Sequence, residues 1–243
     1  MGPAVRRASR ARPRRFRRWL ARLFAAFILV LGVYHGWVFW QVWQLREHNP
    51  RTTSFMQKGL ERLQASDPKA RLQRHWVPYE QISEHLKRAV IAAEDQKFLD
   101  HEGFDVKAIQ EAFEKNARRG RIRRGASTIS QQLARNLFLS QRRTYVRKAQ
   151  EALFTMMLEH ALDKRRILDL YLNVIEWGSG IYGAEAAAQH YYGKAAADLE
   201  PEEAARLAAM IPSPRLYTNH PSTPYLEQRT DILLGQMEYV RVP

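Results

Sequence analysis

Two short blocks hold the side chains of this sequence that could do chemistry. The first runs from Glu94 to Asp105 and places carboxylates, an aromatic ring and a histidine at the end of an apolar helical run. The second runs from Gly125 to Asn136 and puts hydroxyls, amides and a cation on one short helix. A carboxylate in such a place is a candidate general base, and neighbouring cations can hold a departing anion. Together the blocks predict a site for sugar transfer.

Glu94 is the candidate base. It ends a largely apolar helix, so we expect it to be partly buried with a raised pKa, and Asp95 beside it adds like-charge repulsion in the same direction. An isolated Glu-Asp pair would more often be two solvated acids at a helix end. His101 has no second histidine at ligand spacing, so a loop-orienting role is favoured over a metal ligand, and Phe98 is expected to pack in the interior.

Polar residues of the second and third blocks recur at helical spacing. Thr128, Gln132 and Arg135 should present a hydroxyl, an amide and a guanidinium on one helix face, which suits contacts with a phosphate and a sugar. In the third block, Arg147 and Glu151 lie four residues apart. Read alone, they predict a surface ion pair worth about 0.2 to 0.5 kcal/mol.

The ordered blocks resemble the motifs of the peptidoglycan glycosyltransferases, which polymerise lipid II into glycan strands. That family typically shows Glu-Asp, Phe and His, then Gly-x-Ser-Thr-Ile-Thr-Gln-Gln followed by Lys, then Arg-Lys-x-x-Glu. Here Ser130 stands where Thr is usual and Arg135 where Lys is usual, which keeps the hydroxyl and the charge. A fourth block, 171–194, resembles the next motif. The likeness runs from about residue 76 to about residue 214 and is closest to the monofunctional, membrane-anchored branch.

The resemblance implies a role for each matching residue. Glu94 and Glu151 become the catalytic carboxylates, and Arg147 and Lys148 lie near the diphosphate. The implied substrate contacts are Asp95, Phe98, His101, Ser127, Thr128, Gln132, Arg135, Asn136, Arg147 and Lys148. No metal-ligating residue is predicted, although the resemblance allows a divalent cation, Mg²⁺ or Mn²⁺, to bridge the pyrophosphate.

The sequence predicts that the elements positioning these side chains are helices. Apolar residues recur about every four positions through most of the chain beyond Pro78, strand signals are scarce, and no repeat emerges. Helix starts are expected at Thr53 or Ser54, Ser83, Asp105, Ser127, Thr144, Asp163 and Pro201. The helix from Asp163 is expected to continue to Gly178. We therefore predict an all-α domain, and the resemblance implies a lysozyme-like arrangement.

Most of the formal net charge of +14 lies in an N-terminal tail. Nine arginines and no acid fall within residues 1–22, so the rest carries +5. The uncharged run Leu23–Trp40 would span roughly 27 Å as a helix, close to the bilayer's hydrocarbon core of about 30 Å. Aromatic residues at its exit favour an uncleaved anchor over a signal peptide, and the arginines predict a cytoplasmic N-terminus. That topology disfavours a DNA-binding role for the tail.

The expected domains follow from this order. They are a basic cytoplasmic tail (1–22), a transmembrane anchor (23–43), a juxtamembrane linker (44–75) and a glycosyltransferase domain (76–243). An amphipathic helix in the linker could lie on the membrane or dock on the domain. The basic run 115–124 reads equally well as a solvated segment or as a site for anionic headgroups or the lipid pyrophosphate. No cysteine is present, which excludes disulfides and thiolate metal sites.

Three functions compete for this sequence. The leading one is an inverting peptidoglycan glycosyltransferase that joins lipid II units by β-1,4 linkage and releases undecaprenyl pyrophosphate. The alternatives are a membrane-anchored, lysozyme-like glycan hydrolase, which would not need cations around a diphosphate, and a non-enzymatic cell-wall scaffold, which would not need the two glutamates. The Ser66-Asp67-Pro68-Lys69 match to the Ser-x-x-Lys transpeptidase pattern is read as accidental, because Pro68 breaks the helix.

The expected location is the bacterial inner membrane, crossed once, with the catalytic domain on the periplasmic side. The expected partners are lipid II, the growing glycan strand and the membrane. The resemblance also allows cell-division or other cell-wall synthesis proteins, and nucleic acid is not expected.

Overall fold

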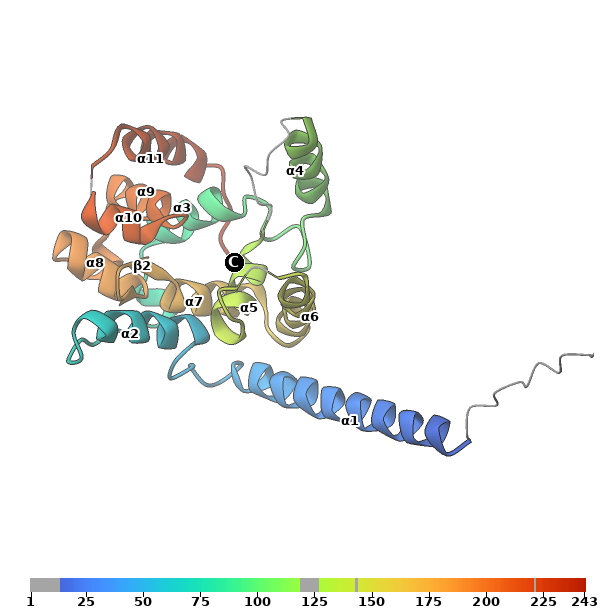
Figure 1. Ribbon diagram of the computed structural model, residues 1–243. Helices are drawn as coiled ribbons and strands as arrows, with labels where there is room; N and C mark the ends of the chain where they lie inside the picture. The colour runs from blue at the N-terminus through green and yellow to red at the C-terminus, as the bar shows by residue number, and fades with distance from the viewer. Residues whose placement is uncertain (1–13, 119–126, 143, 221) are drawn as a thin grey trace, which may run out of the picture. The chain divides into compact units, whose positions relative to one another are not determined.

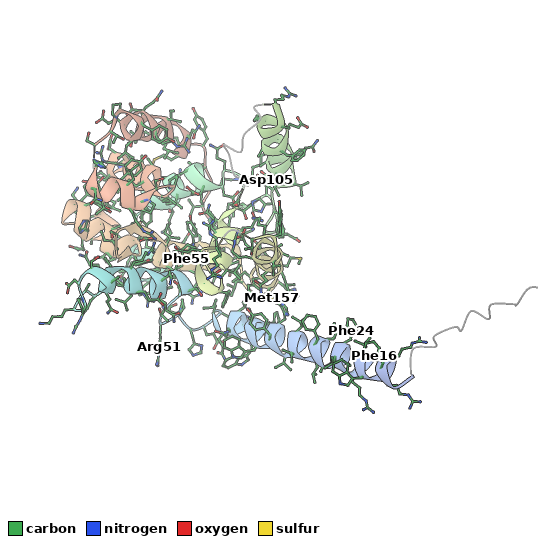
Figure 2. All side chains as sticks on the ribbon, in the orientation of Figure 1. Phe16, Phe24, Arg51, Phe55, Asp105 and Met157 are labelled. Atoms are coloured by element: carbon green, nitrogen blue, oxygen red, sulfur yellow. The ribbon has the colours of Figure 1, made fainter. Side chains whose placement is uncertain are left out.

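The computed structural model describes residues 14–118, 127–142, 144–220 and 222–243. The chain divides into two compact units, residues 1–41 and residues 42–243. Helix α1 spans Arg14–Gln44, and its residues 14–41 make up the described part of the first unit. Within the described residues, the stretch Phe16–Gln44 is the one helix long and apolar enough to cross a membrane, with a mean hydropathy of 1.9. Most of its large apolar side chains are exposed, among them Phe16 and Phe24 (Figure 2), as lipid contact would require.

The second unit is predominantly helical, as predicted. Its α-helices are α2 Ser54–Ser66, α3 Glu84–Glu94, α4 Val106–Arg118, α5 Ile129–Phe138, α6 Tyr145–Ala161, α7 Lys164–Val174, α8 Ala184–Tyr192, α9 Pro201–Met210, α10 Pro214–Asn219 and α11 Pro224–Met237. Two short 3₁₀ helices are η1 Tyr79–Gln81 and η2 Ala196–Asp198. Helices α3, α9 and α11 pack together, and α5 packs against both α6 and α7 (Figure 1). Fully buried aromatic side chains, including Phe98, Phe154 and Tyr171, fill the interior.

A small sheet interrupts the helical pattern. Strands β1 Gln73–Arg74, β2 Glu176–Gly178 and β3 Ile181–Tyr182 form a sheet of order β1-β3-β2, with β1 parallel and β2 antiparallel to β3. The expectation that the helix from Asp163 runs to Gly178 is therefore wrong. Helix α7 stops at Val174 because Ile175 adopts an extended backbone and Glu176 pairs with Tyr182.

Helix starts were largely predictable from capping residues. The expected starts at Thr53, Ser83, Asp105, Thr144, Asp163 and Pro201 are confirmed. The start at Ser127 is wrong by one residue, because Thr128 caps α5. Gln131 lies three residues after Thr128, the spacing that a reciprocal capping box needs. Helices α10 and α11 were not predicted.

Helix α2 docks on the domain, which answers a question the sequence left open. The Ser54 hydroxyl donates to the Leu137 carbonyl at the end of α5, 3.1 Å away, and the Tyr182 hydroxyl donates to the Phe55 carbonyl at 3.1 Å. Gly59 lies so close to the Tyr182 hydroxyl that a larger side chain would collide with it. Helix α2 ends at Ser66, so Ser66 and Lys69 do not share a helix. Most of the basic run, residues 119–124, lies outside the described residues.

Candidate active site

Glu94 opens onto a cavity of about 490 Å³. It is the last residue of α3 and is partly buried. The cavity is lined by the end of α3 and the residues after it, by one face of α4, by the start of α5 and by α11. Charged or polar lining residues are Glu94, Asp95, Gln96, Lys97, Asp105, Glu111, Lys115, Ser127, Thr128, Arg229 and Gln236. Figure 2 marks Asp105, which lies immediately before α4.

The surroundings of Glu94 shift the pKa of its carboxyl group in opposing directions. Burial raises the pKa of Glu94, and Asp95 contributes in the same direction, as predicted from the sequence. Three groups oppose this rise in pKa. They are the Gln132 amide, whose Nε2 donates to Glu94 Oε2 at 2.6 Å, and the charges of Arg229 and Arg135. The carboxylate is therefore partly desolvated while a hydrogen bond and two cations stabilise its ionised form.

Asp95 ties the loop after α3 to the start of α5. Its carboxylate accepts a hydrogen bond from His101 Nε2 at 2.9 Å and from the backbone N–H of Ile129, the first residue of α5, at 3.0 Å. The backbone N–H of Gly103 donates to His101 Nδ1 at 3.1 Å, so Nε2 carries the proton that faces Asp95. Both nitrogens are thereby engaged, and His101 orients the loop. Direct substrate contacts from Asp95 and His101 remain predictions.

Phe98 lies in the interior, fully buried, with the ammonium of Lys164 4.8 Å from its ring centroid. Lys164 begins α7 and donates to the carbonyl of His101 at 2.6 Å and to Glu159 at 2.8 Å. This cation therefore fastens the loop of the first block to α6 and α7. The expectation that Phe98 packs in the interior is confirmed, and its role in substrate binding remains a prediction.

The side chains of Thr128 and Asn136 form hydrogen bonds with backbone groups. The Thr128 oxygen accepts from the Gln131 backbone N–H, while its hydroxyl proton is donated to the Gly103 carbonyl at 2.7 Å. Asn136 donates to the Gln132 carbonyl at 2.8 Å and is nearly buried. Ser127 lines the cavity. Of the trio expected on one face, Gln132 and Arg135 approach Glu94, whereas the Thr128 hydroxyl is occupied in holding the helix start.

Arg135 has unused donor capacity close to Glu94. Its guanidinium lies 5.7 Å from the ring centroid of Phe55 on α2 (Phe55 is labelled in Figure 2). Its Nε is buried and has no hydrogen-bond partner among the described residues. Buried donors are normally satisfied, so this unpaired donor near the Glu94 carboxylate is an exception.

Glu151 is held between two cations on α6. Both carboxylate oxygens are paired, one with Arg147 and the other with Lys148. The Glu151 side chain is 2% exposed and that of Arg147 is 15% exposed, so the pair is not the exposed helix-surface pair that spacing alone suggested. Arg147 Nε, like Arg135 Nε, is buried without a partner among the described residues. Helix α5 links the two glutamates, because it bonds Glu94 and packs on α6.

The sequence did not connect two residues, Arg229 and Tyr171, with Glu94. Arg229 on α11 donates to the Ala93 carbonyl at 3.3 Å and lines the cavity. It lies beyond the region of resemblance, and no sequence signal joined it to Glu94. Tyr171 was noticed as part of the fourth block, but its contact with Gln132 at 2.9 Å could not be read from the sequence.

Metal-ligating side chains do not gather into a cluster in the described part of the chain. No group of three or more His, Asp or Glu side chains there could hold a metal ion.

Comparison with known proteins decides the family. A family model described as Transglycosylase matches residues 60–238. The chain belongs to the transglycosylase family. A biosynthetic peptidoglycan transglycosylase of Nitrosospira multiformis is 56% identical over 228 residues, which cover 94% of this chain and 99% of that protein.

Other transglycosylases are similarly close. Proteins of the same name from Azoarcus sp. (strain BH72) and Thiobacillus denitrificans are 58% and 52% identical over 227 and 226 residues. Each alignment covers 93% of this chain and 97% of the relative. The transglycosylase match begins within α2 and reaches the end of α11, so it includes Glu94, Glu151 and Arg229.

Proposed function

We propose that this transglycosylase polymerises lipid II into β-1,4-linked glycan strands, with inversion and release of undecaprenyl pyrophosphate. The observation that carries the proposal is the contrast between two glutamates. Glu94 faces a cavity and has a raised pKa, whereas Glu151 is buried between Arg147 and Lys148. One carboxylate is available to take a proton, and the other is available to organise cations.

Each part of the reaction then has a group to perform it. Glu94 removes the proton of the acceptor 4-hydroxyl, and the resulting oxygen attacks the α-linked anomeric carbon of the donor. The bond from that carbon to the pyrophosphate oxygen breaks, and its electron pair leaves with undecaprenyl pyrophosphate. Arg135, Arg147 and Lys148 stabilise the departing charge, because preorganised cations act where charge develops.

The paired state of Glu151 supports glycosyl transfer over hydrolysis. A retaining or inverting hydrolase uses two carboxyl groups that flank the scissile bond directly. In this chain, both oxygens of Glu151 are engaged by cations, which suits a diphosphate leaving group. A scaffold would require neither arrangement.

We further propose that α1 anchors the chain once in the inner membrane, with the transglycosylase domain on the periplasmic side. The length of the helix and the arginines before and within its N-terminal part support this orientation. The proposed domain limits are a tail at 1–22, an anchor at 23–43, a juxtamembrane segment at 44–75 and the catalytic domain at 76–243. Binding to cell-division or other cell-wall synthesis proteins remains a prediction of the resemblance.

Incubation of the purified full chain with lipid II in detergent tests the proposed reaction. We expect lipid-linked polymer and one undecaprenyl pyrophosphate for each linkage formed. Release of soluble saccharides from preformed strands, without consumption of lipid II, would indicate the hydrolase instead. Binding of glycan with no change in either substrate would indicate the scaffold.

A further inference from the structure

Tyr171 does not line the cavity, and its side chain is connected to Glu94 through Gln132. It is fully buried on α7, which packs side by side with α5 (Figure 1). Its hydroxyl donates to Oε1 of Gln132 at 2.9 Å, and Nε2 of the same amide donates to Glu94 at 2.6 Å. The three side chains thus form one chain of hydrogen bonds that ends on the carboxylate.

The hydroxyl proton of Tyr171 determines which end of the Gln132 amide faces Glu94. Burial raises the pKa of Tyr171 well above its ordinary value, so the hydroxyl keeps its proton. Among the described residues, the amide oxygen of Gln132 accepts the hydrogen bond from this hydroxyl. If the amide were reversed, its oxygen would face the Glu94 carboxylate, and the buried Tyr171 proton would lose its acceptor. Both changes are unfavourable.

The geometry points to Tyr171 as a positioning residue that fixes the Gln132 amide with its N–H directed at Glu94. This inference rests on the proposed role of Glu94 as the base. Tyr171 is not among the residues that line the cavity, so it acts through Gln132 and does not contact the reacting atoms. Gln132 holds the carboxylate in place and favours its ionised form, because hydrogen bonds to a carboxylate stabilise its charge.

Several other charged groups face Glu94 and also influence its pKa. Asp95 follows it in the chain, Arg135 approaches from α5 and Arg229 from α11. The other charged residues of the cavity are Lys97, Asp105, Glu111 and Lys115. None of these is changed when the Tyr171 hydroxyl is removed. Loss of the fixed amide then raises the pKa of Glu94, so that less base is ionised at a given acidic pH.

Replacement of the hydroxyl provides the test. Tyr171→Phe keeps the ring and the packing, and the matched control is Tyr182→Phe, which removes another buried hydroxyl, bonded to the Phe55 carbonyl. The pH dependence of lipid II polymerisation is measured for the full chain in detergent. We expect Tyr171→Phe to move the acid limb of the kcat profile up by about one pH unit, equivalent to about tenfold at acidic pH, with little change in KM. The control should keep the wild-type limb.

The remaining variants separate positioning from structural damage. Gln132→Met removes the amide and should move the acid limb in the same direction, even if Tyr171→Phe fails to fold. In the Gln132→Met background, Tyr171→Phe should cause no further shift. A loss of activity by the same factor at every pH in Tyr171→Phe, or an unshifted limb in Gln132→Met, would overturn the inference. Near-normal activity in Glu94→Gln would instead overturn the proposed function, so the two failures are distinguishable.

Discussion

The two glutamates of this transglycosylase differ in their neighbours more than in their chemistry. Glu94 has an amide partner and an open cavity, while Glu151 has two cations and almost no exposed surface. A carboxylate with free space can accept a proton from a substrate. One that neutralises two cations is better suited to holding them in position.

This difference predicts unequal effects of the same substitution. Glu94→Gln should lower the polymerisation rate by about 10² to 10⁴, the usual contribution of a general base, while the domain stays folded. Glu151→Gln should cause a smaller loss that responds to added divalent cation, because it frees Arg147 and Lys148 from their partner. Polymerisation of lipid II, with circular dichroism as the folding control, measures both. Near-normal polymerisation by Glu94→Gln would remove the basis of the mechanism.

Arg229 supports a separate prediction about pH. It lowers the pKa of Glu94, so Arg229→Gln should raise that pKa and move the acid limb of kcat/KM to higher pH. Arg241→Gln is the matched control, since Arg241 is also a C-terminal arginine but is largely exposed and pairs with Asp100. The pH profile of polymerisation at saturating and limiting lipid II distinguishes the variants. An identical limb in both would show that Arg229 does not act on Glu94.

Sequence reasoning identified the chemical groups better than their partners. The raised pKa of Glu94 and the pairing of Arg147 with Glu151 follow from local spacing. The contacts from Tyr171 to Gln132 and from Arg229 to Ala93 join residues 39 and 136 positions apart. Local periodicity carries no record of such distant contacts, so they required the fold.

Helix α5 is the element on which the site depends. Its start is held by the Thr128 capping box and by the Asp95 carboxylate, and its later turns carry Gln132 and Arg135 toward Glu94. Capping residues made most helix starts readable from the sequence. The short strands β2 and β3 were not readable, because two or three paired residues leave no periodic pattern.

The capping box predicts how stability depends on two neighbouring hydroxyls. Thr128→Val should lower the free energy of unfolding by about 1 to 2 kcal/mol, since it removes the cap and also the bond to the Gly103 carbonyl. Ser127→Ala, one position earlier, should change it by less than about 0.5 kcal/mol. Denaturant unfolding of the two variants measures this. Greater destabilisation by Ser127→Ala than by Thr128→Val would place the cap at Ser127, as the sequence had suggested.

At the scale of the whole molecule, a long apolar helix precedes the transglycosylase domain in the chain. Helix α1 exposes apolar side chains along most of its length, whereas the second unit buries most of its own. The sequence made this division predictable, because the uncharged run is long and the arginines lie on one side of it. What the sequence could not provide was the docking of α2, which depends on its contacts with α5 and β3.

The absence of cysteine allows a direct test of the proposed orientation. Two single-cysteine variants are needed. Ser9→Cys lies in the basic tail, and Ser222→Cys lies at an exposed position before α11. In each variant the new cysteine is the only thiol in the chain. In intact spheroplasts, a membrane-impermeant maleimide should label Ser222→Cys. It should label Ser9→Cys only after lysis, because the arginines are expected to keep the N-terminus in the cytoplasm. Both proteins should stay in the membrane fraction after a high-salt wash. The reverse labelling pattern would contradict the topology, and recovery of a soluble form beginning near residue 45 would reject the anchor.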